Sequence, residues 1–364
     1  MIPPIENRIF EPKQRAQSPL LAAGIFKRLG IVTEDSHNVC NKKLVVGIGS
    51  ALVDILALED EEFINRSGAA KGGMVLVSND IIESTLSKTT KKPSIVPGGS
   101  ACNTIVGIGR LGGAARFVGK LGEDELGKFF EKDLEKNNVE PFLFTSPSPT
   151  GRVLSIITPD AQRSMFTCLG AASETKLEEI TENCFKGAVI VHIEGYLLFN
   201  RELIQSALIS AKAAGALVSL DLASFTVVEE SKEFLGKLVD DYVDILIANE
   251  DEAFAFTGHK DELQALAALS KRADIAVLKL GKKGSYISRR GEIIKVAPKG
   301  NGFAVDTTGA GDLWAAGFLF GFVNGYSLEK CGELGSACGY EVCQVVGANI
   351  PEAGWERIKE IIKQ

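Results

Sequence analysis

The sequence predicts an α/β fold, namely a three-layer α/β/α sandwich with a central, mostly parallel sheet and a small β-sheet lid. Short runs of apolar residues recur along the chain, and longer segments with helical periodicity separate them, which is the pattern of βαβ units. The lid is predicted by two stretches, residues 55–97 and 142–168, in which short alternating segments are bounded by turn residues. We interpret these segments as antiparallel strands inserted into the α/β body.

The strands of the central sheet are expected in short runs that are mostly apolar, as in strands that are buried on both faces. The first such run is LVVGIG at residues 44–49, and similar runs lie at 188–193, 216–220, 244–248 and 275–280. Helices are expected between these strands at 202–214, 229–239, 250–256 and 261–272. After residue 305 the chain is expected to be helical at 310–323, 327–345 and 353–363.

The composition places the chain among soluble globular proteins. Of its 364 residues, 45% are hydrophobic and 24% are charged, which allows a sizeable core without a stabilising metal or disulfide. A net charge of −7 without a basic stripe is not the electrostatic pattern of a nucleic-acid-binding protein. No apolar run reaches the roughly 18 residues that a membrane span requires. We therefore expect neither nucleic acid nor a membrane as a partner.

The domain boundary is expected near residue 40. Residues 1–40 contain prolines, scattered charges and one short apolar run without the features of a secretory signal, so we expect a poorly ordered N-terminal extension. An organelle-targeting segment is the alternative for this stretch. Residues 41–364 would form the functional domain, with the lid inserted in it. Seven cysteines without a CxxC pair predict free thiols, and therefore a cytoplasmic protein.

The most informative motif is DTTGAGD at residues 306–312, which leads directly into an apolar helical segment. The start of a helix presents unpaired amides and a partial positive charge, so it can bind an anion. Gly309, Ala310 and Gly311 carry little or no side chain, which lets a phosphate group approach their amides. Asp312 would lie beside that phosphate in the first helical turn, where its carboxylate can accept a proton from an attacking hydroxyl.

A second glycine motif, PGGSACNT, lies upstream at residues 97–104. Gly98 and Gly99 allow the backbone to approach a sugar ring. The side chain of Asn103 offers the hydroxyls of that sugar both a donor and an acceptor. The nearby string GIGRLG at residues 107–112 matches the G-x-G-x-x-G pattern of dinucleotide sites. In those sites the glycines directly follow a buried strand, whereas here they fall inside a helical segment. We therefore reject a dinucleotide site at this string.

Together the two motifs resemble the ribokinase-like, or PfkB, family of carbohydrate and nucleoside kinases. Residues 306–312 match the family signature D-T-x-G-A-G-D, residues 97–104 are similar to its N-terminal glycine motif, and the resemblance covers about residues 44–350. It implies a ribokinase-like fold, with Asp312 as the catalytic base and an anion hole formed by the amides of Gly309, Ala310 and Gly311. It also implies an acceptor site at Gly98, Gly99 and Asn103 and a monovalent cation site, for K⁺, at Asp306.

Other residues gain a role from the same resemblance. Asp54 would bind the hydroxyls of the acceptor, because a carboxylate can accept two hydrogen bonds from a vicinal diol. Asn249 and Glu252 match the family's N-x-x-E motif and would organise Mg²⁺ through water. Arg163 resembles the lid arginine of the adenosine kinase branch, which places a cation over the phosphates. The nucleotide would contact Asn249, Lys279, Gly281, Gly284 and Thr307.

The function that these motifs predict is an ATP-dependent phosphotransferase that uses Mg²⁺ with ATP. It would phosphorylate a primary alcohol of an adenosine-like nucleoside or of a sugar. Two alternatives stay open. One is a sugar kinase of the same family that acts on ribose, a ketohexose or a keto-deoxy sugar acid, and the other is a non-catalytic nucleoside or nucleotide sensor. The oligomeric state, monomer or homodimer, also stays open.

Overall fold

The computed structural model describes residues 43–68, 71–160, 162–300 and 302–363, which belong to one compact unit. The prediction of a poorly ordered extension over residues 1–40 lies outside these described residues. From edge to edge, the main sheet consists of β14 (Glu292–Val296), β13 (Ser285–Arg289), β12 (Ile275–Lys279), β11 (Ile245–Asn249), β10 (Leu217–Asp221), β9 (Ala188–Glu194), β1 (Leu44–Ile48), β5 (Ala115–Gly122) and β6 (Val139–Ser146).

All neighbouring strands from β12 to β6 are parallel, as the apolar runs predicted. The strands β13 and β14, which the sequence analysis did not identify, form an antiparallel hairpin that extends the sheet beyond β12. Their short alternating sequences, SYISR and EIIKV, are typical of an edge hairpin rather than of a strand buried on both faces.

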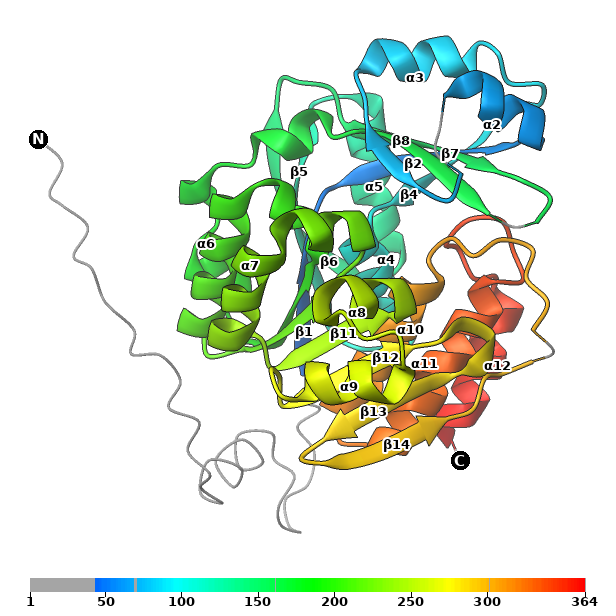
Figure 1. Ribbon diagram of the computed structural model, residues 1–364. Coiled ribbons are helices and arrows are strands. Elements are labelled where there is room, and N and C mark those ends of the chain that lie inside the picture. Colours follow the sequence, from blue (N-terminus) through cyan, green and yellow to red (C-terminus); the bar gives the residue numbers. More distant parts are fainter. Residues whose placement is uncertain (1–42, 69–70, 161, 301, 364) are drawn as a thin grey trace, which may run out of the picture. The chain divides into compact units, whose positions relative to one another are not determined.

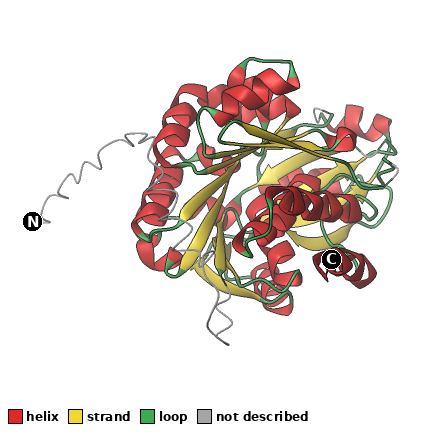
Figure 2. Cartoon of the chain, turned by 90° about the horizontal axis from the view of Figure 1, so that it is seen from below, coloured by secondary structure: helices red, strands yellow, loops and turns green. Residues whose placement is uncertain are grey.

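Helices cover both faces of the main sheet and complete the predicted three layers (Figures 1 and 2). One face packs against α4 (Ser100–Arg110), α5 (Glu125–Lys136), α10 (Ala310–Val323), α11 (Leu328–Val342) and α12 (Glu352–Lys363). The other face packs against α6 (Arg201–Ala213), α7 (Phe225–Tyr242), α8 (Glu250–Thr257) and α9 (Glu262–Ser270). Within the part of the chain that the structure describes, no helix is long and apolar enough to cross a membrane.

Alternate residues of each central strand contribute to the two hydrophobic cores. In β11, Ile245 and Ile247 pack into the core that contains α10, whereas Leu246 and Ala248 pack into the core that contains α7 and α8. Each of these four residues is at most 1% exposed. Because side chains alternate across a strand, burial on both faces requires the continuous apolar sequence that β11 has.

A second sheet lies beside the main sheet, and we call it the lid sheet (Figure 1). Its strand order is β3 (Met74–Leu76), β8 (Arg163–Cys168), β7 (Gly151–Ile157), β2 (Leu52–Leu58) and β4 (Ser94–Gly98). The expectation of antiparallel strands is wrong for two of its pairings, since β2 with β7 and β3 with β8 are parallel. The strands β2 and β7 follow the parallel strands β1 and β6, and they therefore leave the main sheet in the same direction. The prediction that the lid includes residues 142–146 is wrong, because these residues belong to β6 at the edge of the main sheet.

The two faces of the lid sheet differ. One face packs against α2 (Glu61–Ser67) and α3 (Asn79–Leu86) through residues that include Ile55, Leu154 and Phe166. On the opposite face lie Leu52 and Val153, which are three positions before Ile55 and one position before Leu154, together with Asp54. The alternation of side chains along a strand thus turns Asp54 toward the main sheet while its neighbour Ile55 fills the lid core.

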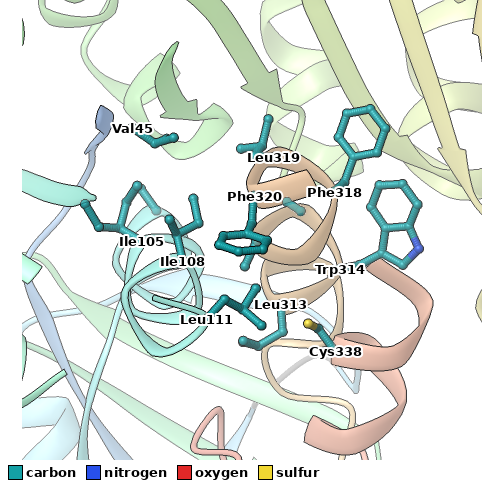
Figure 3. Packing of buried hydrophobic residues seen from close by; sticks show 14 of the residues in the cluster. Val45, Ile105, Ile108, Leu111, Leu313, Trp314, Phe318, Leu319, Phe320 and Cys338 are labelled. Atoms are coloured by element: carbon teal, nitrogen blue, oxygen red, sulfur yellow. The ribbon is translucent and has the colours of Figure 1, made fainter. Parts of the chain in front are cut away.

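Helix α10 is buried from Leu313 to Val323, between α4 and α11 (Figure 3). The rings of Trp314 and Phe318 stack with their centroids 5.3 Å apart. A Cβ added to Gly107 of α4 would lie 2.6 Å from Cβ of Ala316, so this glycine allows the two helices to approach closely. Because packing holds α10 on several sides, the position of its N-terminus is fixed relative to both sheets.

Candidate active site

A cavity of about 910 Å³ lies between the lid sheet and the carboxyl ends of the main-sheet strands. Four neighbouring parallel strands end in a polar residue that lines it, namely Glu194 in β9, Asp221 in β10, Asn249 in β11 and Lys279 in β12. Ligands of open α/β sheets bind at this end of the strands. Of the predicted site residues, the cavity is lined by Asp54, Gly99, Asn103, Arg163, Asn249, Glu252, Lys279, Gly281, Gly284, Thr307, Gly309, Ala310, Gly311 and Asp312. Gly98 and Asp306 do not line the cavity.

Asp312 lies in the first turn of α10, and α4 holds its carboxylate. Ser100 Oγ donates to Oδ1 at 2.8 Å, and Asn103 Nδ2 donates to Oδ2 at 2.9 Å. Burial raises the pKa of Asp312 above its ordinary value, and the hydrogen bonds from Asn103 and Ser100 oppose this rise. A carboxylate that is oriented at both oxygens and has a raised pKa is suited to accept a proton.

The turn before Asp312 exposes the start of α10 to the cavity. Gly309, the N-cap residue, has a φ of 73°, a left-handed conformation that glycine adopts without strain. The Ala310 amide donates to the Thr307 carbonyl at 3.1 Å, so it is already used within the turn. The amides of Gly311 and Asp312 belong to the first helical turn, where an α-helix supplies no acceptor. These two amides, rather than that of Ala310, are therefore the donors available to an anion.

Asp306 stabilises this turn from behind. Its side chain is fully buried, and its Oδ1 accepts hydrogen bonds from the amide and the hydroxyl of Thr308 at 2.9 and 2.7 Å. Its Oδ2 accepts a hydrogen bond from the amide of Gly347 at 2.7 Å. The carboxylate therefore ties the segment before α10 to the chain that follows α11.

Asp54 packs against Gly98 where the lid sheet lines the cavity. A Cβ added to Gly98 would lie 2.4 Å from Cγ of Asp54, so Gly98 makes room for the aspartate rather than for a ligand. Gly99 has a φ of 96° and is the N-cap residue of α4. Burial raises the pKa of Asp54 to about 6, although the nearby positive charge of Arg163 opposes the rise. Arg163, the first residue of β8, therefore lies close enough to Asp54 for its charge to act on that carboxyl group.

The ammonium group of Lys279 lies beside the start of α10, where the sequence analysis predicted that a phosphate group binds. Its Nζ donates to Asp221 Oδ2 at 2.7 Å. A Cβ added to Gly311 would lie 2.9 Å from this Nζ, so Gly311 leaves the ammonium group the space it occupies. Burial acts to lower the pKa of Lys279, but attraction to Asp221 and Glu252 outweighs it, and the resulting pKa is above the ordinary value. Lys279 therefore carries its positive charge inside the cavity.

Asn249 and Glu252 form a reciprocal cap at the N-terminus of α8. Asn249 Oδ1 accepts a hydrogen bond from the Glu252 amide at 2.9 Å, and Glu252 Oε2 accepts one from the Asn249 amide at 2.8 Å. Asn249 Nδ2 also donates to Glu252 Oε1 at 2.7 Å. The N-x-x-E spacing is also the spacing of a capping box. It therefore has a structural explanation in addition to the predicted role in organising Mg²⁺.

The acidic groups near Glu252 fit a magnesium ion that a nucleotide brings with it. Within the described residues, no group of three or more His, Cys, Asp or Glu side chains could hold a metal ion by itself. Burial, followed by repulsion from Asp221, raises the pKa of Glu252 well above its ordinary value. A cation between these buried carboxylates would relieve the repulsion, and Mg²⁺ needs only one or two protein carboxylates when phosphates and water supply its other ligands.

Several cavity residues escaped the sequence analysis. Ser100, Glu194 and Asp221 each have a polar side chain that holds another site group. Tyr196 and Phe199, whose rings stack with centroids 6.4 Å apart, also line the cavity. Glu194 and Asp221 could have been found from their position, because each directly follows an apolar strand at the end where ligands bind. The sequence holds no comparable signal for the aromatic pair.

Comparisons with known proteins agree with this geometry. The family model for pfkB family carbohydrate kinases matches residues 72–353. A 5-dehydro-2-deoxygluconokinase from Geobacillus thermodenitrificans is 31% identical over 259 residues, which span 66% of this chain and 76% of that protein. A nucleoside kinase from Methanocaldococcus jannaschii is 27% identical over 270 residues, which span 73% of this chain and 85% of that protein.

Solved structures show the same architecture. The adenosine kinase from Sinorhizobium meliloti superposes with a TM-score of 0.82 and 33% identity, covering 89% of this chain and 99% of that one. A probable sugar kinase from Rhizobium etli superposes with a TM-score of 0.83 and 31% identity, covering 88% of this chain and 98% of that one. These matches confirm the ribokinase-like fold. The chain belongs to the pfkB family of carbohydrate kinases, and it is an ATP-dependent kinase of a sugar or a nucleoside.

Proposed function

We propose that the protein transfers the γ-phosphoryl group of ATP to a primary hydroxyl of a nucleoside, with Asp312 as the general base. The observation that carries this proposal is the character of the acceptor end of the cavity. There, the polar groups of Asp54 and Asn103 lie next to an apolar wall that could hold a nucleobase. That wall consists of Leu52, Met74, Val153, Met165, Leu169, Tyr196 and Phe199.

The proposed acceptor site has a polar part and an apolar part. Asp54 and Asn103 would bind the ribose hydroxyls, since a carboxylate and an amide offer the acceptors and donors that a diol needs. The stacked pair Tyr196 and Phe199 would contact the face of the base, because every nucleobase has a flat face on which an aromatic ring can stack. A free sugar has less apolar surface to bury against such a wall than a nucleoside has.

The proposed phosphoryl transfer uses the start of α10. Asp312 takes the proton of the acceptor hydroxyl as the hydroxyl oxygen attacks the γ-phosphorus, and ADP leaves with the electrons of the broken bond. The amides of Gly311 and Asp312, the ammonium group of Lys279 and the guanidinium of Arg163 stabilise the negative charge of the transferred group. Thr307, Gly281 and Gly284 would line the remainder of the ATP site.

Ions enter the proposal at two places. Mg²⁺, when bound with ATP, would neutralise phosphate charge, and Glu252 and Asn249 would hold it through water. K⁺ would act at Asp306, whose three hydrogen bonds leave about one lone-pair site of the carboxylate for a cation. Turnover in K⁺ compared with choline at equal ionic strength tests the second assignment, and equal rates would contradict it.

A second acceptor class has one observation in its favour. The guanidinium of Arg163 lies close enough to Asp54 to oppose the rise that burial causes in the pKa of that carboxyl. A cation at this place could bind the carboxylate of a keto-deoxy sugar acid instead of a phosphate group.

One assay separates the two acceptor classes. Product formation is measured with magnesium-ATP and equal concentrations of nucleosides, ribose, a ketohexose and a keto-deoxy sugar acid. We expect the highest kcat/KM for a nucleoside, with adenosine as the leading candidate. The variant Phe199→Ala should raise KM for that nucleoside and leave KM for ribose nearly unchanged. The highest kcat/KM for a sugar acid, or an absence of phosphorylated product from every acceptor, would refute the proposal.

A further inference from the structure

Glu194 is a buried carboxylate that the phosphoryl-transfer chemistry does not use. It is the last residue of β9, it is 1% exposed, and it lines the cavity. Its Oε1 accepts a hydrogen bond from the amide of Ser50 at 2.8 Å, and its Oε2 accepts one from the amide of Ala101 at 2.9 Å. A buried charge needs hydrogen-bonding partners, and these two come from backbone that is distant in sequence.

Both amides lie where the chain crosses between the main sheet and the lid sheet. Ser50 stands between β1 of the main sheet and β2 of the lid sheet. Ala101 stands in the first turn of α4, which follows β4 of the lid sheet after the single residue Gly99. One carboxylate therefore binds the chain both where it enters this part of the lid and where it leaves it.

The backbone around Glu194 is shaped to fit the carboxylate. A Cβ added to Gly49 would lie 2.4 Å from Oε2 of Glu194, so any other residue at position 49 would displace the side chain. A Cβ added to Gly99 would lie 2.5 Å from the carbonyl oxygen of Ser50, so the two crossings themselves pack in contact. The two glycines and the carboxylate form one compact junction beneath the lid.

The residues next to these crossings belong to the proposed catalytic machinery. Ser100 and Asn103 lie in the same first turn of α4 as Ala101, and both donate hydrogen bonds to Asp312. Asp54, four residues beyond Ser50, lies at the acceptor end of the cavity. A shift of either crossing would therefore move the acceptor relative to the base, and a misplacement of about 1 Å can cost on the order of 100-fold in rate.

We propose that Glu194 is a positioning residue that joins both lid crossings and thereby aligns the acceptor site with the catalytic base. This inference rests on the proposed role of Asp312. The carboxylate suits the role because it supplies an acceptor to each amide, whereas a carboxamide has only one acceptor oxygen. Burial raises the pKa of Glu194 to about 7, and the amides of Ala101 and Ser50 together with the dipole at the N-terminus of α4 favour its charged form.

The test compares Glu194→Gln with a matched control. In the variant, the new amide group faces one of the two backbone amides as a second donor, so one crossing is released. We expect KM for the acceptor to rise about tenfold and kcat to fall on the order of 10–100-fold, while KM for ATP changes by less than about twofold. Amide hydrogen exchange should become faster in β2 and β4 and stay unchanged in β10 and β11.

The control is Glu341→Gln, which removes another buried carboxylate, 5% exposed, from α11, where its partner is Arg357. This variant should keep wild-type kinetics for both substrates. Equal rises in both KM values of the Glu194→Gln enzyme, or faster exchange throughout the main sheet, would overturn the proposal in favour of a general structural role. The assay uses whichever acceptor the wild-type enzyme phosphorylates, so a failure of the nucleoside proposal leaves this test intact.

Discussion

The substitution Asp312→Asn should abolish most of the turnover and leave the fold intact. The carboxamide can keep both contacts to α4 if its oxygen accepts from Asn103 Nδ2 and its amide group donates to Ser100 Oγ, because a hydroxyl both donates and accepts. Only the capacity to accept a proton is then lost. General-base catalysis contributes about 10²–10⁴-fold, which corresponds to a rise of about 3–5 kcal/mol in the activation free energy.

The assay is steady-state phosphorylation of the preferred acceptor, combined with equilibrium binding of an ATP analogue. We expect kcat to fall by about 10²–10⁴-fold and the dissociation constant of the ATP analogue to change by less than about threefold. The matched control is Asp133→Asn in α5, a half-buried aspartate that accepts a hydrogen bond from an asparagine, Asn137, outside the cavity. Turnover within a factor of a few of wild type in Asp312→Asn would refute the assignment of the base.

Three further predictions concern metal binding, pH and packing. Glu252→Gln should raise the Mg²⁺ concentration that gives half-maximal turnover by roughly 10–100-fold, and an unchanged midpoint in a magnesium titration would contradict the magnesium assignment. Because burial raises the pKa of Asp54 to about 6, its charged form is lost as the pH falls through that value, so kcat/KM for the acceptor should fall there; a flat profile from about pH 7 to pH 5 would show that the charge is not needed. Gly317→Ala would place a Cβ 2.5 Å from the carbonyl oxygen of Leu334, and urea unfolding should show a loss of about 1–3 kcal/mol; full stability would contradict the close packing of α10 on α11.

Local sequence was sufficient to predict the elements that build the reaction centre. The strands β9 to β12 are short, mostly apolar runs, and α10 begins and ends where the motif and the periodicity predicted. Asp312 could be identified because its neighbours Gly309 and Gly311 mark a helix start that a phosphate can approach. These are properties of short segments, so they can be recognised without knowledge of the rest of the fold.

Features that depend on distant segments could not be predicted in the same way. The pairing of Lys279 with Asp221 joins the ends of two different strands, and the apolar sequence of those strands does not encode which charges meet. The parallel pairing of β2 with β7 follows from the directions of β1 and β6, which only the assembled sheet defines. Gly98 was assigned to the ligand, but its missing Cβ is required by the side chain of Asp54.

The most direct test of the account is a crystal structure with the acceptor, Mg²⁺ and a non-hydrolysable ATP analogue. The account predicts an acceptor hydroxyl within about 2.6–3.2 Å of a carboxylate oxygen of Asp312. It also predicts that the terminal phosphate accepts hydrogen bonds from the amides of Gly311 and Asp312. A terminal phosphate bound away from the start of α10, or an acceptor without a hydroxyl near Asp312, would contradict the central claim.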